Sequence, residues 1–225
     1  MSNILTTHVG SLPRSKELSE FLFAKDKGEK FSQSSFDEVL KNNVESVVKR
    51  QLDVGIDFVS DGEMSKISYA TYIKDRIDGF SGESERRAPA DLDDFPEYKE
   101  KIAKSGGTPT YTRPCCTNEL KVKDETSLLQ DINNFKNSLD KLNHRHAFMN
   151  SASPGVINVF MPNKFYSTED EYLDKLSNIM AKEYELITKS DIQVQLDCPD
   201  LALARHMNFK NLSEDEFIKL SLIHI

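Results

Sequence analysis

The sequence predicts an α/β fold of the (β/α)8 TIM-barrel type that is incomplete at its C-terminus. Short runs rich in Val, Ile and Thr alternate with helical periodicity, which is typical of β/α units around a parallel sheet. About five such units can be counted, whereas a closed barrel has eight. The last helical pattern runs into the final residue without a termination signal. We therefore expect residues 1–225 to form a single partial barrel domain, with a doubly wound open sheet as the alternative.

The first predicted elements follow one another closely. Residues 5–9 are a Thr-, Val- and Leu-rich run that stops at a Gly-Ser-Leu-Pro turn, so we expect a strand there. Apolar residues on one side predict a short helix over 15–24. A continuous apolar stripe predicts the clearest helix of the chain over 35–54, with a capping box at Ser35 and its end at Gly55.

The middle of the chain is less regular. Residues 56–60 predict a second strand, which ends at an Asp-Gly-Glu turn. Tyr and Ile at helical spacing predict a helix over 66–80. An irregular, charged insertion is expected over about 81–110, with at most a short helix near 98–103. Residues 112–122 then predict a third strand.

The second half returns to alternating elements. Helical spacing predicts a helix over 126–142, and the apolar stretch 147–160 predicts a strand, a tight turn and a further apolar segment. Capping residues at Thr168 predict another long helix. A strand over 192–196 follows, and a last helix is expected to begin at Ser213.

Composition narrows the possible partners and location. The net charge is −8, and the basic residues are scattered, so we expect no nucleic-acid partner. No apolar run approaches the ~20 residues that a membrane helix needs, so we expect no membrane partner. Three cysteines, of which two are adjacent, do not form a secreted disulfide framework and favour a reducing, cytoplasmic location.

Candidate functional residues stand where predicted strands end, the place where parallel α/β folds gather their sites. Glu63 and Asp197 end two different strands, and two converging carboxylates are suited to binding an ammonium group. Gly10 would allow the backbone to approach a ligand closely, and Ser11 adds a hydroxyl group. Each carboxylate alone is also an ordinary turn or strand-exit residue. Together these residues predict a binding site for an amine.

Two further groups have structural interpretations that we favour over functional ones. Strand alternation would direct Cys115 and Cys116 to opposite faces, which favours core filling over nucleophilic catalysis. His144 and His146 have a spacing that can chelate a metal in a strand, but a solvated basic loop is the favoured interpretation.

Four segments together resemble one family: Thr6–Arg14, 55–63, 78–80 and 194–199. They are similar to the catalytic barrel of cobalamin-independent methionine synthase and, more closely, to its shorter single-barrel relatives. The resemblance implies a (β/α)8 barrel that transfers a methyl group from a methyltetrahydrofolate-type donor to a thiol such as homocysteine, in methionine synthesis.

The resemblance also assigns roles by position. It implies that Val9, Gly10, Ser11, Glu63 and Asp197 hold the amino-acid substrate. The expectation for Glu63 and Asp197 agrees with the amine site inferred from their charge.

Donor contacts are implied for Arg113, Cys115 and Cys116. The chain departs from the family at two nearby positions, because Cys198 replaces a glutamate and Leu203 replaces a folate-facing glutamate. It also has no tryptophan to pack against a folate. Another methyl donor or another thiol is therefore an alternative.

Zinc is expected in the full-length protein, because a metal lowers the pKa of a bound thiol and orients its sulfur. The resemblance implies that the zinc ligands and a proton-donating histidine lie on later strands. We therefore expect no catalytic residue and no metal ligand in this chain, which appears truncated, and we expect the fragment alone to be inactive. Alternatives are a related thiol alkyl-transferring barrel, a uroporphyrinogen decarboxylase-like barrel or a catalytically silent binding fragment. An exposed sheet edge predicts self-association.

Overall fold

A parallel sheet forms the centre of the molecule. The computed structural model describes residues 4–84, 90–104, 111–123 and 125–222. Its parallel strands are β1 (Val59–Ser60), β4 (Ala147–Ala152) and β5 (Gln193–Asp197), in the order β1-β4-β5. On the other side of β1, Thr7 forms a parallel bridge with Phe58. The first predicted strand is therefore present as this single bridge, and the sheet has the arrangement of a partial barrel.

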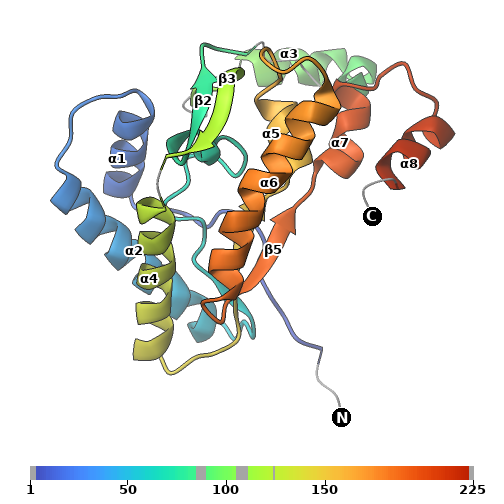
Figure 1. The fold of residues 1–225 in the computed structure, drawn as a ribbon. Coiled ribbons are helices and arrows are strands. Elements are labelled where there is room, and N and C mark those ends of the chain that lie inside the picture. The colour runs from blue at the N-terminus through green and yellow to red at the C-terminus, as the bar shows by residue number, and fades with distance from the viewer. Residues whose placement is uncertain (1–3, 85–89, 105–110, 124, 223–225) are drawn as a thin grey trace.

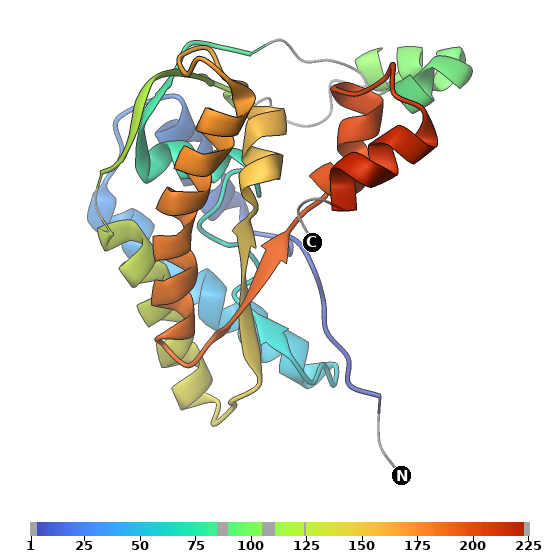
Figure 2. The ribbon, with the colours of Figure 1, turned by 45° about the vertical axis from the view of Figure 1, so that its right-hand side comes forward.

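Three long helices cover one side of the sheet. They are α2 (Gln33–Asp53), α4 (Thr126–Lys141) and α6 (Glu169–Thr188). Each one lies in the sequence between two neighbouring parallel segments, as the connection between parallel strands requires. Figures 1 and 2 show α4 and α6 along one side of β4 and β5, with the N-terminal segment on the other side.

The start of α2 differs from the expectation. The helix begins at Gln33 rather than at Ser35, because the hydroxyl of Ser32 accepts a hydrogen bond from the Ser35 backbone N–H. The predicted capping box at Ser35 is therefore wrong. Its end is confirmed, because Gly55 has φ +84° and donates its backbone N–H to the Leu52 carbonyl.

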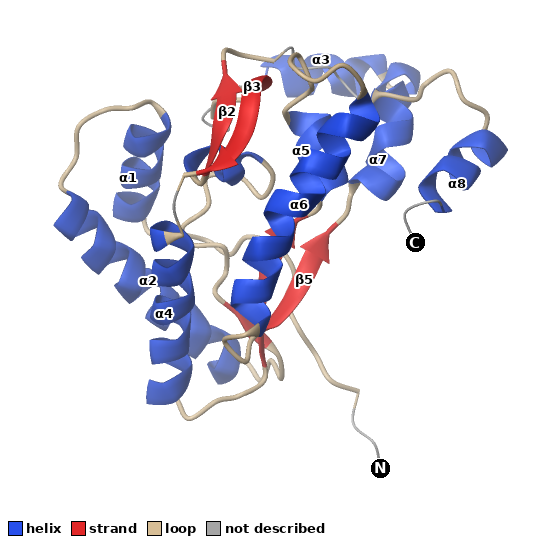
Figure 3. Ribbon diagram, viewed as in Figure 1, coloured by secondary structure: helices blue, strands red, loops and turns tan. Residues whose placement is uncertain are grey.

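Residues 66–80 do not form the expected helix. A short 3-10 helix, η1 (Thr71–Asp75), is followed by β2 (Ile77–Ser81). This strand pairs antiparallel with β3 (Cys115–Val122), so the third predicted strand does not lie in the parallel sheet (Figure 3). Gly79 lies inside the ribbon at φ +108°, where an added Cβ would be 2.9 Å from the Asn118 carbonyl oxygen. This close pairing outweighs the helical spacing of the Tyr and Ile residues.

The remaining elements are shorter. They are α1 (Lys16–Asp26), η2 (Ala90–Asp94), α3 (Pro96–Lys104), α5 (Pro154–Phe160), α7 (Asp200–Met207) and α8 (Glu214–Leu222). The cap expected at Ser213 is confirmed, because its hydroxyl and backbone N–H both donate to the Glu216 carboxylate. Within the predicted insertion, η2 and α3 are present, while 85–89 and 105–110 lie outside the described residues. The sequence analysis missed α7.

Two apolar clusters hold the fold together. One joins α1, α2 and α4 to the helix-facing side of the sheet and includes Leu18, Val48 and Phe135. The other lies between α5, α6 and the β2–β3 ribbon and includes Ile73 and Tyr172. Among the described residues, no helix is both long and apolar enough to cross a membrane.

Candidate functional site

The loops that follow the first two parallel segments are joined at Glu63. The Ser11 hydroxyl donates to Glu63 Oε2 at 2.5 Å, and the Leu12 backbone N–H donates to the Gly62 carbonyl at 3.1 Å. Gly10 has φ +90° and open space where a Cβ would stand. Val9 has a side chain that is 54% exposed. The structure thus brings Ser11 and Glu63 into contact, with Gly10 at the edge of the same loop.

Glu63 occupies a backbone conformation that is uncommon for its residue type. Its φ is +56°, directly after Gly62 at +64°, and its backbone N–H donates to the Asp61 carboxylate at 3.0 Å. Arg14 Nη2 donates to the Glu63 backbone carbonyl at 2.7 Å. Non-glycine residues in the left-handed region tend to occur where a site requires a specific side-chain direction. The turn directs a fully buried carboxylate toward the first loop.

The second predicted carboxylate belongs to the end of β5. Asp197 Oδ1 accepts a hydrogen bond from Asn150 Nδ2 on β4 at 3.0 Å. Lys66 Nζ, which is buried, donates to the Asn150 backbone carbonyl, and the Lys66 backbone N–H donates to the Glu63 carbonyl at 3.1 Å. Hydrogen bonds therefore connect Glu63 to Asp197 through two residues. We call Ser11, Glu63, Lys66, Asn150 and Asp197 the strand-end cluster.

The charges of Glu63 and Asp197 both influence the pKa of one aromatic residue, Tyr69. Burial raises the pKa of the Tyr69 hydroxyl, and the negative charges of Asp197 and Glu63 raise it further, while Arg113 lowers it. Tyr69 is therefore within electrostatic reach of both ends of the strand-end cluster. Both acids therefore influence the same tyrosine.

The strand-end cluster contains buried polar atoms that lack partners. Among the described residues, Glu63 Oε1 and Asn150 Oδ1 of this cluster are closed off from solvent and form no hydrogen bond, and the same holds outside the cluster for His8 Nε2, Arg14 Nε, Thr71 Oγ1, Arg113 Nε and Asn134 Nδ2. Such atoms cost about 1–3 kcal/mol each when nothing satisfies them, so they are rare in native proteins. The two unpartnered acceptor oxygens of the strand-end cluster distinguish this region as the candidate site.

Arg113 lies next to this region but outside its hydrogen-bond network. Its guanidinium carbon is 4.9 Å from the Phe160 ring centroid, and the Phe160 ring is 5.5 Å from that of Tyr69. A cation over an aromatic ring face is a favourable contact. Arg113 is thus separated from Tyr69 by one aromatic side chain.

The environments of the three cysteines are unlike that of a catalytic thiol. Cys115 and Cys116 are buried in β3, and burial raises the pKa of Cys116 to about 11. Burial also raises the pKa of the Cys198 thiol, next to Asp197. Because the thiolate is the reactive form, Cys116 and Cys198 are poor nucleophiles at neutral pH. The burial of Cys115 and Cys116 agrees with core filling in β3.

The described residues do not fit a bound zinc ion. No group of three His, Cys, Asp or Glu side chains within that part of the chain could hold a metal. His144 Nε2 lies 3.0 Å from the backbone carbonyl oxygens of both Asp57 and His146, so that nitrogen faces main-chain acceptors. We therefore derive no chemical step through a metal from these residues.

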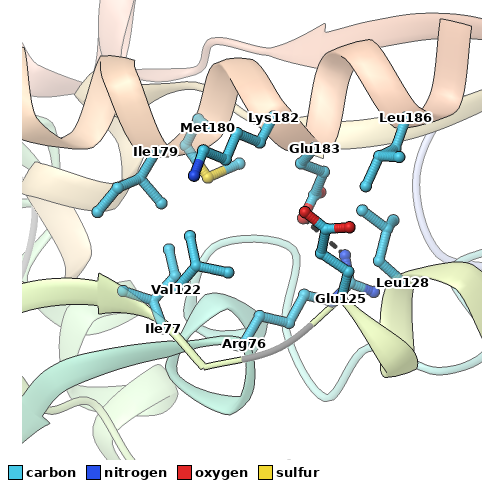
Figure 4. Close-up of a pocket in the computed structure, with 10 residues that line it drawn as sticks. All are labelled: Arg76, Ile77, Val122, Glu125, Leu128, Ile179, Met180, Lys182, Glu183 and Leu186. Carbon is cyan, nitrogen blue, oxygen red and sulfur yellow. Dashed lines mark hydrogen bonds and ion pairs between the residues drawn. The ribbon is translucent and has the colours of Figure 1, made fainter. Parts of the chain in front are cut away.

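A second group of buried charges lies between the sheet and α6. Arg76 donates to Glu183 Oε2 at 2.7 Å and to Asp131 Oδ2 at 2.5 Å, and Tyr72 and Ser151 donate to Glu183 Oε1. Figure 4 shows Arg76 and Glu183 facing each other beside a cavity of about 30 Å³. We call Arg76, Asp131, Glu183, Tyr72 and Ser151 the buried charge cluster. Its carboxylates are all hydrogen bonded, which fits a structural role.

Sequence reasoning missed three residues of the candidate site. Lys66 was placed in a helix, and Asn150 stands inside a predicted strand rather than at its end. Arg14 belongs to the segment used for the family resemblance, but no role was assigned to it. Alternation along 147–152 could have placed Asn150 on the face opposite Met149.

Comparison with known proteins finds a family match over the first part of the chain. Residues 4–89 match the family described as the catalytic domain of cobalamin-independent synthase. A methionine synthase from Sulfolobus acidocaldarius is 26% identical over 195 residues, covering 86% of this chain and 51% of that protein. A 5-methyltetrahydropteroyltriglutamate–homocysteine methyltransferase from Bifidobacterium adolescentis is 31% identical over 75 residues, which is 33% of this chain and 10% of that protein.

A solved structure supports the fold. The B12-independent methionine synthase from a Shewanella species, in complex with selenomethionine, superposes with a TM-score of 0.63 and 15% identity. The match covers 87% of this chain and 52% of that one. The chain thus spans about half the length of the Sulfolobus protein and of this structural neighbour. These matches show that residues 4–89 are similar to the catalytic domain of cobalamin-independent synthase and that the chain shares the fold of a B12-independent methionine synthase.

Proposed function

We propose that the strand-end cluster binds the ammonium group of an amino acid such as homocysteine or methionine. The observation that carries this proposal is the state of Glu63, whose Oε2 is fixed by Ser11 while its buried Oε1 has no partner among the described residues. A buried carboxylate oxygen gains most from a charge-assisted hydrogen bond. An ammonium group supplies both the proton and the opposite charge.

The activity proposed for the whole protein is methyl transfer from a methyltetrahydrofolate-type donor to the thiol of homocysteine. The match of residues 4–89 to the catalytic domain of cobalamin-independent synthase and the names of the relatives support this reaction. Zinc, when bound by a protein, lowers the pKa of a substrate thiol. The described residues provide no site for it, so this chain's own contribution is to bind and orient the amino acid.

Within that contribution, each residue has a separate task. Ser11 holds the Glu63 carboxylate in place, and Asn150 holds that of Asp197. Arg14 fixes the backbone of the Glu63 turn. We propose Val9 and Gly10 as the wall of the same site. Arg113 is the proposed donor contact, supported by its position beyond Phe160, with Cys115 and Cys116 behind it.

Two further proposals concern the setting of the protein. A cytoplasmic location is supported by three cysteines that are all free. Self-association through β5 is supported by its exposure, since β5 pairs only with β4 among the described strands and Leu196 is 44% exposed.

Isothermal titration calorimetry with L-methionine and L-homocysteine tests the binding proposal. Glu63→Gln and Asp197→Asn keep the side-chain shape and remove the charge, so each should weaken binding by about 10- to 150-fold. The matched control is Glu185→Gln on α6, an exposed glutamate paired with Lys189, which should leave binding unchanged. Equal affinities for the parent protein, Glu63→Gln and Asp197→Asn would contradict the proposal.

A further inference from the structure

We propose that Asn150 is a third ligand contact, with its side-chain oxygen accepting a hydrogen bond from the amine of the bound amino acid. The proposal rests on the proposed function and adds a residue that determines specificity. Its observation is independent of family likeness: Asn150 is 2% exposed, and its Oδ1 has no partner among the described residues.

The strand geometry places Asn150 on the correct face of the sheet. Met149 belongs to the apolar cluster against the helices, and Ser151 donates to Glu183 on α6. Side chains alternate along a strand, so Asn150 faces the opposite side. Asn150 pairs with Gln195, and Asp197 lies two residues farther along β5, on the same face as Gln195. The amide and the second carboxylate are therefore neighbours by register.

The hydrogen bonds of Asn150 fix which end of its amide is free. Nδ2 donates to Asp197 Oδ1, and the reverse orientation would set the amide oxygen against a carboxylate. Lys66 Nζ donates to the backbone carbonyl of Asn150 and holds this part of β4 from the other side. Oδ1 is thus held as an acceptor without a donor, in a region where Glu63 Oε1 has the same deficiency.

The number of acceptors matches the number of donors on a primary ammonium group. Such a group has three N–H bonds, and a Lys ammonium shows the same donor count. The acceptors are Glu63 Oε1, Asn150 Oδ1 and Asp197 Oδ2, which has no hydrogen-bond partner among the described residues. A hydroxyl group in place of the amine has one donor and no charge. The site should therefore discriminate strongly against 2-hydroxy acids.

The test compares the affinities of two ligands that differ only in having an amine or a hydroxyl group. Calorimetry would measure Kd for L-methionine and for its 2-hydroxy analogue, 2-hydroxy-4-(methylthio)butanoate, with the parent protein and with Asn150→Leu. Loss of a contact to the amine should weaken methionine binding by about 10-fold and affect the analogue much less, so the ratio of the two Kd values falls. Asn178→Leu, on the exposed side of α6, is the matched control and should keep the parental ratio.

Asn150→Asp provides a second variant if Asn150→Leu does not fold, as judged by circular dichroism. It keeps an acceptor oxygen and should retain the preference for the amine. Equal weakening of both ligands by Asn150→Leu, or loss of the preference in Asn150→Asp, would overturn the assignment. No binding of methionine by the parent protein would instead contradict the proposed function.

Discussion

The molecule contains two groups of buried acids, and they differ in what surrounds them. In the buried charge cluster, Glu183 receives hydrogen bonds from Arg76, Tyr72 and Ser151. In the strand-end cluster, Glu63 receives a side-chain hydrogen bond from Ser11 on one oxygen, and the other oxygen has no partner in the part of the chain that the structure describes. Both carboxylates are almost inaccessible to solvent. The two carboxylates therefore differ in the hydrogen bonds they receive and not in how deeply they are buried.

This contrast separates a structural acid from a ligand-binding one. Burial alone would raise the pKa of Glu183, but the charges of Arg76 and Lys66 and the hydrogen bonds from Tyr72 and Ser151 together outweigh it, and the net pKa is lowered. A carboxylate whose two oxygens both accept hydrogen bonds, one of them from a cation, contributes to the fold and leaves neither oxygen without a partner. Glu63 has one oxygen without a partner among the described residues. Three variants test whether the two groups behave as differently as their contacts suggest.

The largest effect is expected from Arg76→Met. Removing the guanidinium leaves Asp131 and Glu183 buried without their cation, which should lower the free energy of unfolding by about 3–5 kcal/mol. Urea denaturation followed by circular dichroism measures this change. Lys189→Met removes the cation of an exposed pair and should have no measurable effect. Similar stabilities for Arg76→Met and Lys189→Met would remove the distinction between the two groups.

Glu63→Gln should have a smaller effect on stability, and in the opposite direction. It removes a buried negative charge that forms no direct ion pair among the described residues, with the Arg14 guanidinium as the nearby positive charge, so the free energy of unfolding should stay constant or rise by about 1 kcal/mol. The same denaturation experiment applies. A loss comparable to that of Arg76→Met would show that Glu63 is a structural acid.

The smallest effect concerns the rate of thiol labelling. Cys198 lies beside Asp197 and is partly exposed, whereas Cys115 and Cys116 are buried, and the pKa of Cys116 is raised to about 11. We expect a disulfide reagent at pH 8 to label one thiol in the folded protein and three in urea. Cys198→Ser should abolish the rapid phase. Rapid labelling that persists in this variant would show that β3 opens to solvent.

The sequence predicted the helices whose position depends on neighbouring residues alone. The stripe on α2, the cap at Thr168 and the cap at Ser213 are all sequence-local signals, and the helices after them are present. The prediction of a helix over residues 66–80 is wrong because the pairing of β2 with β3 is a long-range interaction, which local spacing does not reveal. The spacing of Tyr and Ile there satisfies an apolar cluster without requiring a helix.

The candidate site divides in the same way. Glu63 and Asp197 could be found because each follows a strand, and the carboxyl ends of parallel strands share one edge. Asn150 lies within β4, so only the register with β5 reveals its link to Asp197. Lys66 could not be found, since the ladder between β1 and β4 ends at the Ser60–Phe148 pair and its contact to Asn150 lies beyond that point.

The left-handed backbone at Glu63 has a consequence for which replacements this position can accept. Conformation alone would prefer Gly, Asn or Asp there and would disfavour β-branched residues most strongly. The proposed amine site requires the longer acid, Glu, at this position. The residue that the backbone conformation favours at position 63 therefore differs from the residue that binds the ligand. A substitution that removes the backbone strain of this turn would give a protein that folds well but no longer binds its ligand.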